Sequence, residues 1–312
     1  TDVALDRPER NPGPLGDLTR LAEIQVYRRD KPRNLEPFRP ENNFRISRGA
    51  TADGAEFVAN EILIALKAGT NVEQFKLLLA QLGGSVIGSI PELGIYRIRL
   101  PAGTNVLALI EQLKNNAIVS RVEPNYAYKI PEGSLDPEAV AAEAKPGAAS
   151  VNPGIPPVAV LDSGLRMVSS LNNFVVGSYD AIQPDRTVDD TKGHGTQMAL
   201  IASGAVAPNG VGGAHAGVPV IGIRAFDDNG YTSSYTLMRA IEYAADQGAR
   251  VVNLSWGTET PSSFLETSIR QAQSRGMIVV ASAGNTPNGK QVYPASFPGV
   301  VSVSALKANG NP

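Results

Sequence analysis

The sequence predicts two folded parts: a small α+β domain of ferredoxin-like type, then an α/β domain with a parallel sheet and helices on both faces. The first prediction rests on a β-α-β-β-α-β order of apolar patterns in residues 57–128. The second rests on short, unbroken apolar runs that alternate with helical patterns from residue 158 onward, as in sheets buried on both faces. Between the two parts, a stretch rich in Ala, Pro, Gly and Glu indicates a linker.

Length and composition are those of a globular protein. The chain has 312 residues, of which 42% are hydrophobic and 19% charged, and this is enough for two domains with a sizeable core. A formal net charge of -2 gives no reason to expect nucleic acid or an anionic membrane as a partner. No apolar run approaches the roughly 20 residues of a membrane span. The absence of cysteine excludes disulfides, thiolate metal sites and a cysteine nucleophile.

Residues 1–54 form the first segment. Arginine, proline and acidic residues alternate there without a sustained period, which indicates an extended N-terminal arm. A solvated arm is the favoured interpretation, and a docked segment is the alternative. The amino end has neither an initiator Met nor a signal-peptide pattern, so we expect that a leader was removed or that a longer chain precedes Thr1.

Residues 55–130 form the predicted α+β domain. Asn71 and Asn105 are candidate caps, because each stands directly before a helical pattern. The elements expected in order are a strand over 61–66, a helix over 71–79, strands over 85–90 and 94–100 around a turn at 91–93, a helix over 105–114 and a strand over 119–128. Together they make one sheet with two helices on a single face. A linker follows over residues 131–157, in which we expect one short helix over 137–145.

Residues 158–312 form the predicted α/β domain. It opens with Val158-Ala159-Val160-Leu161-Asp162, an apolar run that ends in a carboxylate. The later elements expected are a helix beside His194, strands over 220–224, 251–254, 278–281 and 300–305, and helices over 233–247 and 262–274. Ligands of such sheets bind beyond the carboxyl ends of the strands. The side chains at these ends are Asp162, the run Ser255-Trp256-Gly257 and the run Ala283-Gly284-Asn285.

His194 lies between two glycines, just before the apolar run 198–201 that predicts a helix. Glycine on both sides lets another backbone approach the ring closely. Thr196 is the candidate capping residue, which places His194 near the start of the helix. A packed histidine in a glycine-rich turn is the alternative interpretation.

Three of these residues together suggest acyl-transfer chemistry. A carboxylate at Asp162 can hold the imidazole of His194 in one tautomer, which leaves the other ring nitrogen to take a proton from a nucleophile. Asn285 can supply an amide donor to an oxyanion. Taken singly, Asp162 could equally be a structural cap and Asn285 a turn residue.

Five sequence blocks, in their order along the chain, resemble those of the subtilisin-like serine peptidases. They are Val160-Leu161-Asp162-Ser163-Gly164, Gly193-His194-Gly195-Thr196-Gln197-Met198-Ala199, Val251-Val252-Asn253-Leu254-Ser255-Trp256-Gly257, Val280-Ala281-Ser282-Ala283-Gly284-Asn285 and Tyr293-Pro294-Ala295-Ser296-Phe297-Pro298-Gly299-Val300-Val301-Ser302-Val303. The 32 residues that separate Asp162 from His194 (194 − 162) also fit this family. The segment Val122-Glu123-Pro124-Asn125-Tyr126-Ala127-Tyr128 resembles the close of the family's inhibitory propeptide.

The resemblance implies a subtilisin-like fold from Val158 onward, preceded by a propeptide that acts as inhibitor and intramolecular chaperone. It implies a secreted serine endopeptidase, extracellular, periplasmic or on the cell surface, that cuts protein or peptide substrates and matures from a zymogen by autoprocessing. In the family's scheme Asp162 orients His194, His194 is general base and acid, and Asn285 is the oxyanion donor. The residues that would line the substrate cleft are Ser255, Trp256, Gly257, Ala283 and Gly284, paired with the substrate as an added strand.

Trp256 departs from the family, which has a small aliphatic residue at this position. The indole could narrow or cap the pocket nearest the scissile bond, or it could be an aromatic that covers core. The side-chain preference of the enzyme is therefore left open.

The family's nucleophile block, Gly-Thr-Ser-x-Ala-Pro, does not occur in the 312 residues. The serines that belong to other parts of the match are no credible substitute: Ser163, Ser203, Ser255, Ser282 and Ser304. We therefore expect the nucleophile on a companion C-terminal segment, separated by a cut near residues 309–312, and this chain alone would be inactive. The alternative is a non-catalytic binding or scaffolding protein that keeps the fold.

Two further groups of side chains are weaker candidates. His215 falls in a glycine-rich loop, where an exposed residue is favoured over a ligand. The pairs Asp189-Asp190 and Asp227-Asp228 are carboxylates in loops, and the resemblance makes calcium possible. Isolated pairs without other oxygen ligands do not assign a site, so no metal ligand and no certain cofactor is predicted.

Overall fold

A computed structural model describes residues 46–48, 54–130, 145–148, 150–152, 154–207, 217–284 and 289–304. The described residues divide into two compact units. The first unit comprises Asn60–Pro124, and the second comprises residues 46–48, 54–59 and those from Asn125 onward.

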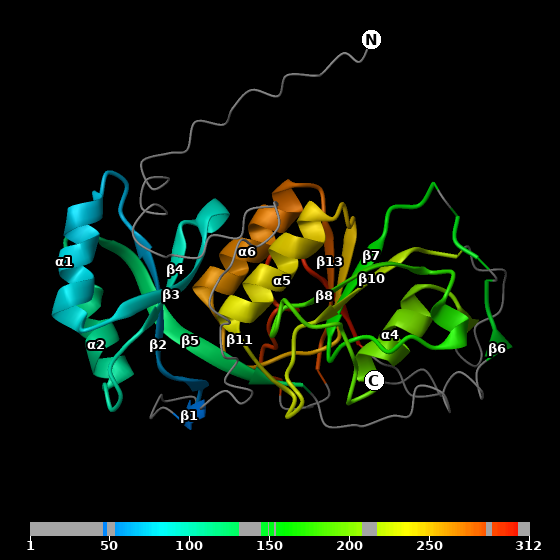
Figure 1. Ribbon diagram of the computed structural model, residues 1–312, viewed down its shortest axis with the longest axis horizontal. Coiled ribbons are helices and arrows are strands. Elements are labelled where there is room, and N and C mark those ends of the chain that lie inside the picture. The colour runs from blue at the N-terminus through cyan, green and yellow to red at the C-terminus, as the bar shows by residue number, and fades with distance from the viewer. Residues whose placement is uncertain are drawn as a thin grey trace, which may run out of the picture. The chain divides into compact units, whose positions relative to one another are not determined.

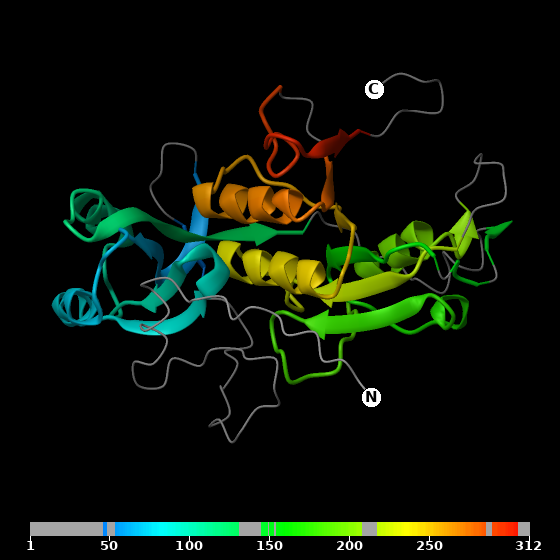
Figure 2. The ribbon, with the colours of Figure 1, turned by 90° about the horizontal axis from the view of Figure 1, so that it is seen from above.

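The first unit has the predicted β-α-β-β-α-β order. Its elements are β2 (Glu56–Leu66), α1 (Val72–Leu82), β3 (Ser85–Ile90), a 3-10 helix (Pro91–Leu93), β4 (Ile95–Arg99), α2 (Val106–Leu113) and β5 (Val119–Lys129). The first residues of β2 and the last residues of β5 are counted with the second unit. The sheet order is β5-β2-β4-β3, and Figure 1 and Figure 2 show α1 and α2 on the same side of this sheet. The ferredoxin-like fold predicted for this part is confirmed.

Local signals in the sequence explain how its helices begin. Asn71 caps α1 through a reciprocal pair of hydrogen bonds, because its side chain accepts from the N–H of Gln74 and the side chain of Gln74 accepts from the N–H of Asn71. Asn105 caps α2 through its side chain. In the core, the ring centroids of Phe75 on α1 and Tyr96 on β4 lie 4.9 Å apart.

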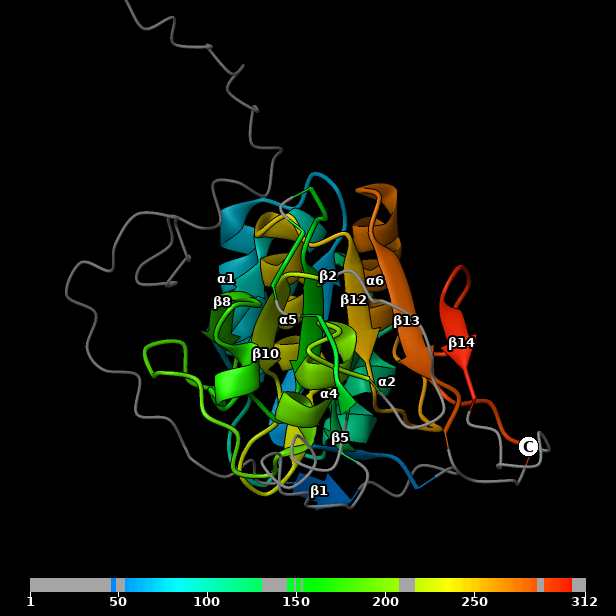
Figure 3. The ribbon, with the colours of Figure 1, turned by 90° about the vertical axis from the view of Figure 1, so that its right-hand side faces the viewer.

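The second unit is built on a parallel sheet with the order β14-β13-β12-β7-β10-β8. The strands are β7 (Val158–Asp162), β8 (Val175–Asp180), β10 (Val220–Arg224), β12 (Val251–Leu254), β13 (Ile278–Ser282) and β14 (Val301–Val303), and the helices are α4 (His194–Ala202), α5 (Ser234–Asp246) and α6 (Ser263–Ser274). Figure 3 shows α4 in front of the sheet and α5 and α6 behind it. The predicted parallel sheet with helices on both faces is confirmed. Within the described part of the chain, no helix has the length and apolar character needed to cross a membrane.

Several short elements lie where the sequence predicts none. They are β1 (Ile46–Arg48), β6 (Lys145–Pro146), β9 (Val206–Ala207), β11 (Tyr231–Ser233), the strand β8 and a 3-10 helix (Ser169–Leu171). Most have two or three residues, which is too short for a period to show. β1 pairs with β2, so these three residues of the predicted arm are a docked strand. Of the helix expected over 137–145, residues 137–144 lie outside the described residues and Lys145 begins β6.

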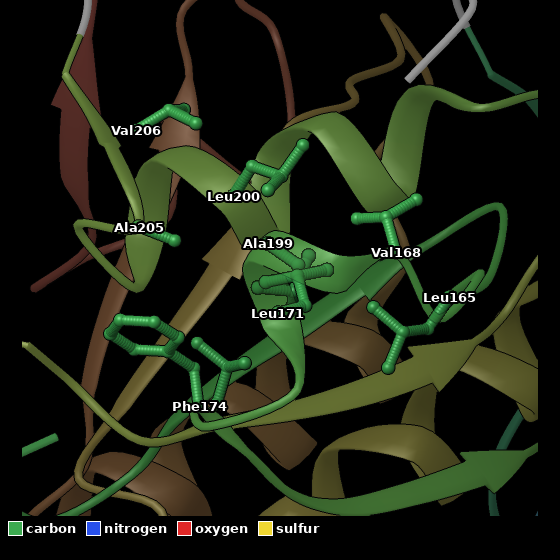
Figure 4. Packing of buried hydrophobic residues seen from close by; sticks show 10 residues of the cluster. Leu165, Val168, Leu171, Phe174, Ala199, Leu200, Ala205 and Val206 are labelled. Atoms are coloured by element: carbon green, nitrogen blue, oxygen red, sulfur yellow. The ribbon is translucent and has the colours of Figure 1, made fainter. Parts of the chain in front are cut away.

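The apolar face of α4 packs into the core between the sheet and the segment that leads to β8. Figure 4 shows Ala199 and Leu200 of α4 close to Leu165, Leu171 and Phe174. None of these five side chains is more than 3% exposed. Burying an apolar side chain of the larger size stabilises the fold by about 1.5 to 3 kcal/mol. The helix that begins at the candidate catalytic histidine is therefore firmly held on the sheet.

Candidate active site

Asp162 and His194 meet at the carboxyl end of the central strand β7. Asp162 is the last residue of β7 and has no exposed surface, and His194 is the first residue of α4. The His194 Nδ1 atom lies 2.7 Å from Asp162 Oδ1, and the same oxygen accepts a hydrogen bond of 2.7 Å from the N–H of Ser163. Because a carboxylate only accepts, Nδ1 carries the proton and Nε2 is the basic nitrogen of the ring. The predicted pairing of Asp162 with His194 is present in the structure.

The glycines on either side of His194 have different tasks. Gly193 is the N-cap of α4 and has a φ of 80°, a left-handed conformation that favours glycine. Gly195 lies against the backbone that follows Asp162, since a Cβ at this position would stand 2.3 Å from the carbonyl oxygen of Gly164. This close approach lets the first turn of α4 sit directly beside the end of β7.

The prediction that Thr196 caps the helix is wrong. The helix begins at His194 with Gly193 as its N-cap, so Thr196 lies within the first turn. The N–H and the hydroxyl of Thr196 both donate to Asp190 Oδ2, over 2.8 and 2.6 Å. Thr196 is a partner of this carboxylate, which takes over the role that a capping side chain would have.

The pKa of His194 is set by opposing effects. Burial of the ring lowers the pKa, whereas the hydrogen bond that Nδ1 donates to Asp162 and the negative charges of Asp162 and Asp190 raise it. The net direction is upward from the ordinary value of 6.5. The site therefore stabilises an imidazolium, which is the state that a general base reaches during the reaction.

The other strand-end residues lie along the same edge of the sheet. β12 pairs in parallel with β7 on one side and with β13 on the other, so the carboxyl ends of all three strands are neighbours. This edge carries Ser255 and Gly257 after β12, and Ala283 and Gly284 after β13. Asn285 and His215 lie outside the described residues, and their predicted roles stay predictions.

Trp256 is packed inside the second unit, with 1% of its surface exposed. Its indole N–H donates to the carbonyl of Leu161 over 3.2 Å, and its ring lies edge-on to Phe226 with centroids 5.9 Å apart. The ring of Tyr128 stacks on the indole at 6.2 Å. These contacts agree with an aromatic that covers core beside Asp162, and a role of Trp256 in binding substrate stays a prediction.

Val292 belongs to the same edge and had no signal in the sequence. A Cβ at Gly257 would lie 2.4 Å from one methyl group of Val292, and a Cβ at Gly284 would lie 3.0 Å from the other. The valine side chain therefore packs against both glycines. It lies in a loop just before Tyr293, without a helical or strand pattern, so only the folded structure brings it to the strand ends.

The second half of β5 belongs to the second unit and adds a strand to β11. The two segments pair antiparallel, with Ala127 opposite Ser233 and Lys129 opposite Tyr231. The N–H of Ile130 extends the ladder by donating to the carbonyl of Gly230 over 2.9 Å. β11 therefore offers a sheet edge that an extended peptide segment can occupy.

Two of the paired carboxylates named in the sequence, Asp190 and Asp228, already have partners within the protein. Both oxygens of Asp190 accept hydrogen bonds from protein N–H and O–H groups, and Asp228 Oδ1 lies 2.9 Å from the guanidinium of Arg224. Among the residues that the structure describes, no group of three or more His, Cys, Asp and Glu side chains is placed to hold a metal ion. These contacts assign no calcium ion to Asp190 or Asp228, and a calcium site stays a possibility that the family resemblance implies.

Comparison with known proteins identifies two family models in this chain. Residues 156–312 match the Subtilase family model, and residues 46–125 match the fervidolysin N-terminal prodomain. The crystal structure of fervidolysin from Fervidobacterium pennivorans, described as a keratinolytic enzyme related to subtilisin, covers 85% of this chain and 46% of its own, with a TM-score of 0.63 and 23% identity. At this identity the likeness shows the fold.

Two curated relatives are similar over long segments. The thermophilic serine proteinase of Bacillus sp. (strain AK1) is 30% identical over 260 residues, which are 80% of this chain and 65% of the relative. Thermitase of Thermoactinomyces vulgaris is 34% identical over 157 residues, which are 49% of this chain and 56% of the relative. The chain thus spans less than two thirds of the length of either relative.

Proposed function

The chain belongs to the subtilase family, and from this premise we propose that it holds the propeptide and the first part of the catalytic domain of a serine endopeptidase. In this proposal Asp162 orients His194, and His194 serves as general base and then general acid in acyl transfer. The observation that carries the proposal is the 2.7 Å contact between Asp162 Oδ1 and His194 Nδ1. It occupies Nδ1, so Nε2 is the ring nitrogen that takes the proton of the nucleophile.

We place the nucleophilic serine on a C-terminal segment beyond these 312 residues, in the same polypeptide or on a companion fragment. The family's nucleophile block does not occur in the sequence. Two of the serines in the matched segments form structural hydrogen bonds, since Ser163 Oγ donates to Asp190 and Ser203 Oγ donates to the carbonyl of Leu200. These engaged hydroxyls support a serine from outside the chain.

Substrate is proposed to bind along the strand ends as an extended peptide. Its backbone would pair with the segments after β12 and β13, where glycine and alanine leave the main chain accessible, and Asn285 would donate to the oxyanion. The residues of this surface are Ser255, Gly257, Ala283 and Gly284. Val292 packs against both of these glycines, so we expect it to limit the side-chain size accepted there.

The upstream domain is proposed to be the chain's own inhibitor. The support is the antiparallel pairing of β5 with β11 and the burial of Tyr128, which is 3% exposed beside Trp256. Autoprocessing would cut the linker that follows Ile130 and convert the zymogen into enzyme. As the family resemblance implies, we place the mature enzyme outside the cytoplasm, as an extracellular, periplasmic or cell-surface protein.

A fluorophosphonate probe, which modifies activated serines, tests this function. The native protein and everything that copurifies with it are labelled, separated under denaturing conditions and sequenced around the labelled residue. We expect the label on a serine in a Gly-Thr-Ser context that lies outside residues 1–312.

The matched control is the same preparation carrying His194→Ala, which should not be labelled because the serine loses its base. If the wild-type preparation contains only these residues and takes up no label, the peptidase proposal is wrong. The non-catalytic binding protein would then replace it.

A further inference from the structure

Asp190 is a second buried carboxylate close to the Asp162–His194 pair, and it has no part in the proposed triad. It has no exposed surface. Its Oδ1 atom accepts from the hydroxyl of Ser163 over 2.8 Å and from the N–H groups of Gly193 and Lys192 over 2.8 and 3.2 Å. Its Oδ2 atom accepts from the N–H and the hydroxyl of Thr196. A carboxylate that collects five donors fixes the atoms around it closely.

These donors come from two places that must meet for catalysis. Gly193 and Thr196 belong to the first turn of α4, and N–H groups at a helix start have no partner within the helix. Because Gly193 is the N-cap and has no side chain, the charge of Asp190 serves as the cap, with the sign that a helix N-terminus favours. The turn that carries His194 is thereby held in place by one carboxylate.

Ser163 is the connection from Asp190 to the end of β7. Its hydroxyl donates to Asp190 and accepts from the N–H of Gly195 over 2.9 Å, while its own N–H donates to Asp162. One residue thus contacts the orienting carboxylate, the buried carboxylate and the first turn of α4. Movement of Asp190 would be passed through Ser163 to both members of the Asp162–His194 pair.

We propose that Asp190 is a positioning residue, which through Ser163 sets the distance and angle at which Asp162 holds His194. The effect of Asp190 on catalysis rests on the proposed peptidase function. The placement of His194 relative to Asp162 is a property of the 312-residue chain and can be measured without activity. The alternative is that Asp190 only stabilises the helix start and that His194 keeps its geometry without it. The two possibilities differ in what happens to the Nδ1 proton of His194 when Asp190 is changed in a protein that remains folded.

The chain offers one probe for the His194 proton and a second probe for local folding. It contains two histidines, so a His215→Ala version leaves His194 as the source of the only imidazole signals in nitrogen-edited NMR spectra. A Nδ1 proton held by a carboxylate resonates far downfield and exchanges slowly with water. The single tryptophan reports folding nearby, because the indole N–H of Trp256 donates to Leu161, the residue before Asp162.

The variant to measure is Asp190→Asn in the full chain. Asparagine keeps one acceptor oxygen but places an NH₂ group against the donors of Ser163 or of Thr196, so one connection is lost. We expect the His194 proton to move upfield and to exchange at least about tenfold faster, while the Trp256 N–H signal stays in place.

Asp180→Asn is the matched control. Asp180 is also a buried carboxylate, 3% exposed, that accepts two backbone N–H groups and an Arg224 hydrogen bond, yet it has no bond to α4. It should cost stability and leave the His194 proton unchanged. If Asp190→Asn also leaves that proton unchanged, Asp190 is only a helix cap and the proposal is wrong.

Ser163→Ala keeps the proposal testable should Asp190→Asn fail to fold. It removes the connecting hydroxyl without leaving a charge unpaired, and it should reproduce the change in the His194 proton; an unchanged proton would overturn the proposal. In the double variant the two changes should not add, since they break one connection. In an assembled enzyme, Asp190→Asn should lower kcat by about 10²-fold with little change in KM. If no peptidase activity exists at all, the NMR result still decides whether Asp190 positions His194.

Discussion

Gly195→Ala tests whether the close approach of α4 to β7 sets the site. A Cβ at this position would lie 2.3 Å from the carbonyl oxygen of Gly164 and 3.1 Å from Asp162 Cβ. Ordinary contact begins at 3.4 Å, so the backbone would have to yield by about 1.1 Å. The obstacle is main chain, which cannot rotate away as a flexible side chain does. Overpacking of this kind typically costs about 1 to 3 kcal/mol.

The magnitude follows from two opposing terms. Alanine is favoured over glycine in a helix by up to about 1 kcal/mol. With a clash against backbone near the upper end of the range, we expect a net loss of about 2 kcal/mol of unfolding free energy. This corresponds to about 4 to 8 °C in Tm for a unit of this size.

Urea unfolding followed by the fluorescence of Trp256 is the assay, because the single, buried tryptophan reports the second unit alone. Gly177→Ala is the control, since its Cβ would meet only Ile221 at 3.7 Å, an ordinary contact. It should be neutral or stabilise by about 0.4 to 1 kcal/mol. Equal stabilities of the two variants would refute the reasoning that Gly195 is there for the sake of close packing.

Three further predictions concern the chemistry. In the assembled enzyme Asp162→Asn should lower turnover by about 10⁴-fold, because the imidazole would be held in the wrong tautomer; a loss below about tenfold in steady-state kinetics would make Asp162 a structural residue. Residues 57–129, made as a separate fragment, should inhibit the enzyme at micromolar concentration, since their last strand would pair again with β11. If the fragment neither slows hydrolysis of a peptide substrate nor raises the refolding yield of the enzyme, this domain only docks and does not inhibit. His194 should titrate above its ordinary 6.5 in an NMR titration, and kcat/KM should rise with pH through that same pKa because the neutral ring is the base. A histidine with a raised pKa in the fold stabilises it fully below pH 6.5 and loses this contribution as the pH rises through the folded value, so a titration midpoint at or below 6.5 would contradict the electrostatics of the site.

Elements with a strong local signal are the ones that the sequence predicts well. The predicted strands over 220–224 and 251–254 coincide with β10 and β12, because each is a short run of mainly apolar residues, as expected for the inner strands of a parallel sheet. β8 is missed, since this edge strand alternates exposed and covered residues and includes Ser178 and Asp180. β11 has three residues and owes its strand geometry to pairing with β5, about a hundred residues earlier. No local pattern carries such information.

The site divides in the same way. Asp162 and His194 are predictable because a carboxylate at a strand end and a histidine between glycines are patterns of neighbouring residues. The sequence shows Asp190 only as one of a pair of loop carboxylates, because its hydrogen bonds to α4 and Ser163 depend on burial and on donors from separate segments. The wrong cap at Thr196 has the same origin: threonine is a good cap locally, and only the fold brings a carboxylate to replace it.

The strand formed by residues 127–129 is tethered to its partner β11 as long as the linker after Ile130 is intact. A tethered segment faces its site at an effective concentration in the millimolar range, however dilute the protein becomes. Once the linker is cut, the same contacts belong to two molecules, and occupancy depends on how much of each is present. Under the proposed function, inhibition by the tethered propeptide would not depend on dilution. After one cleavage, the same propeptide would dissociate when the protein is diluted. The fraction of enzyme that is active would then depend on the protein concentration after release.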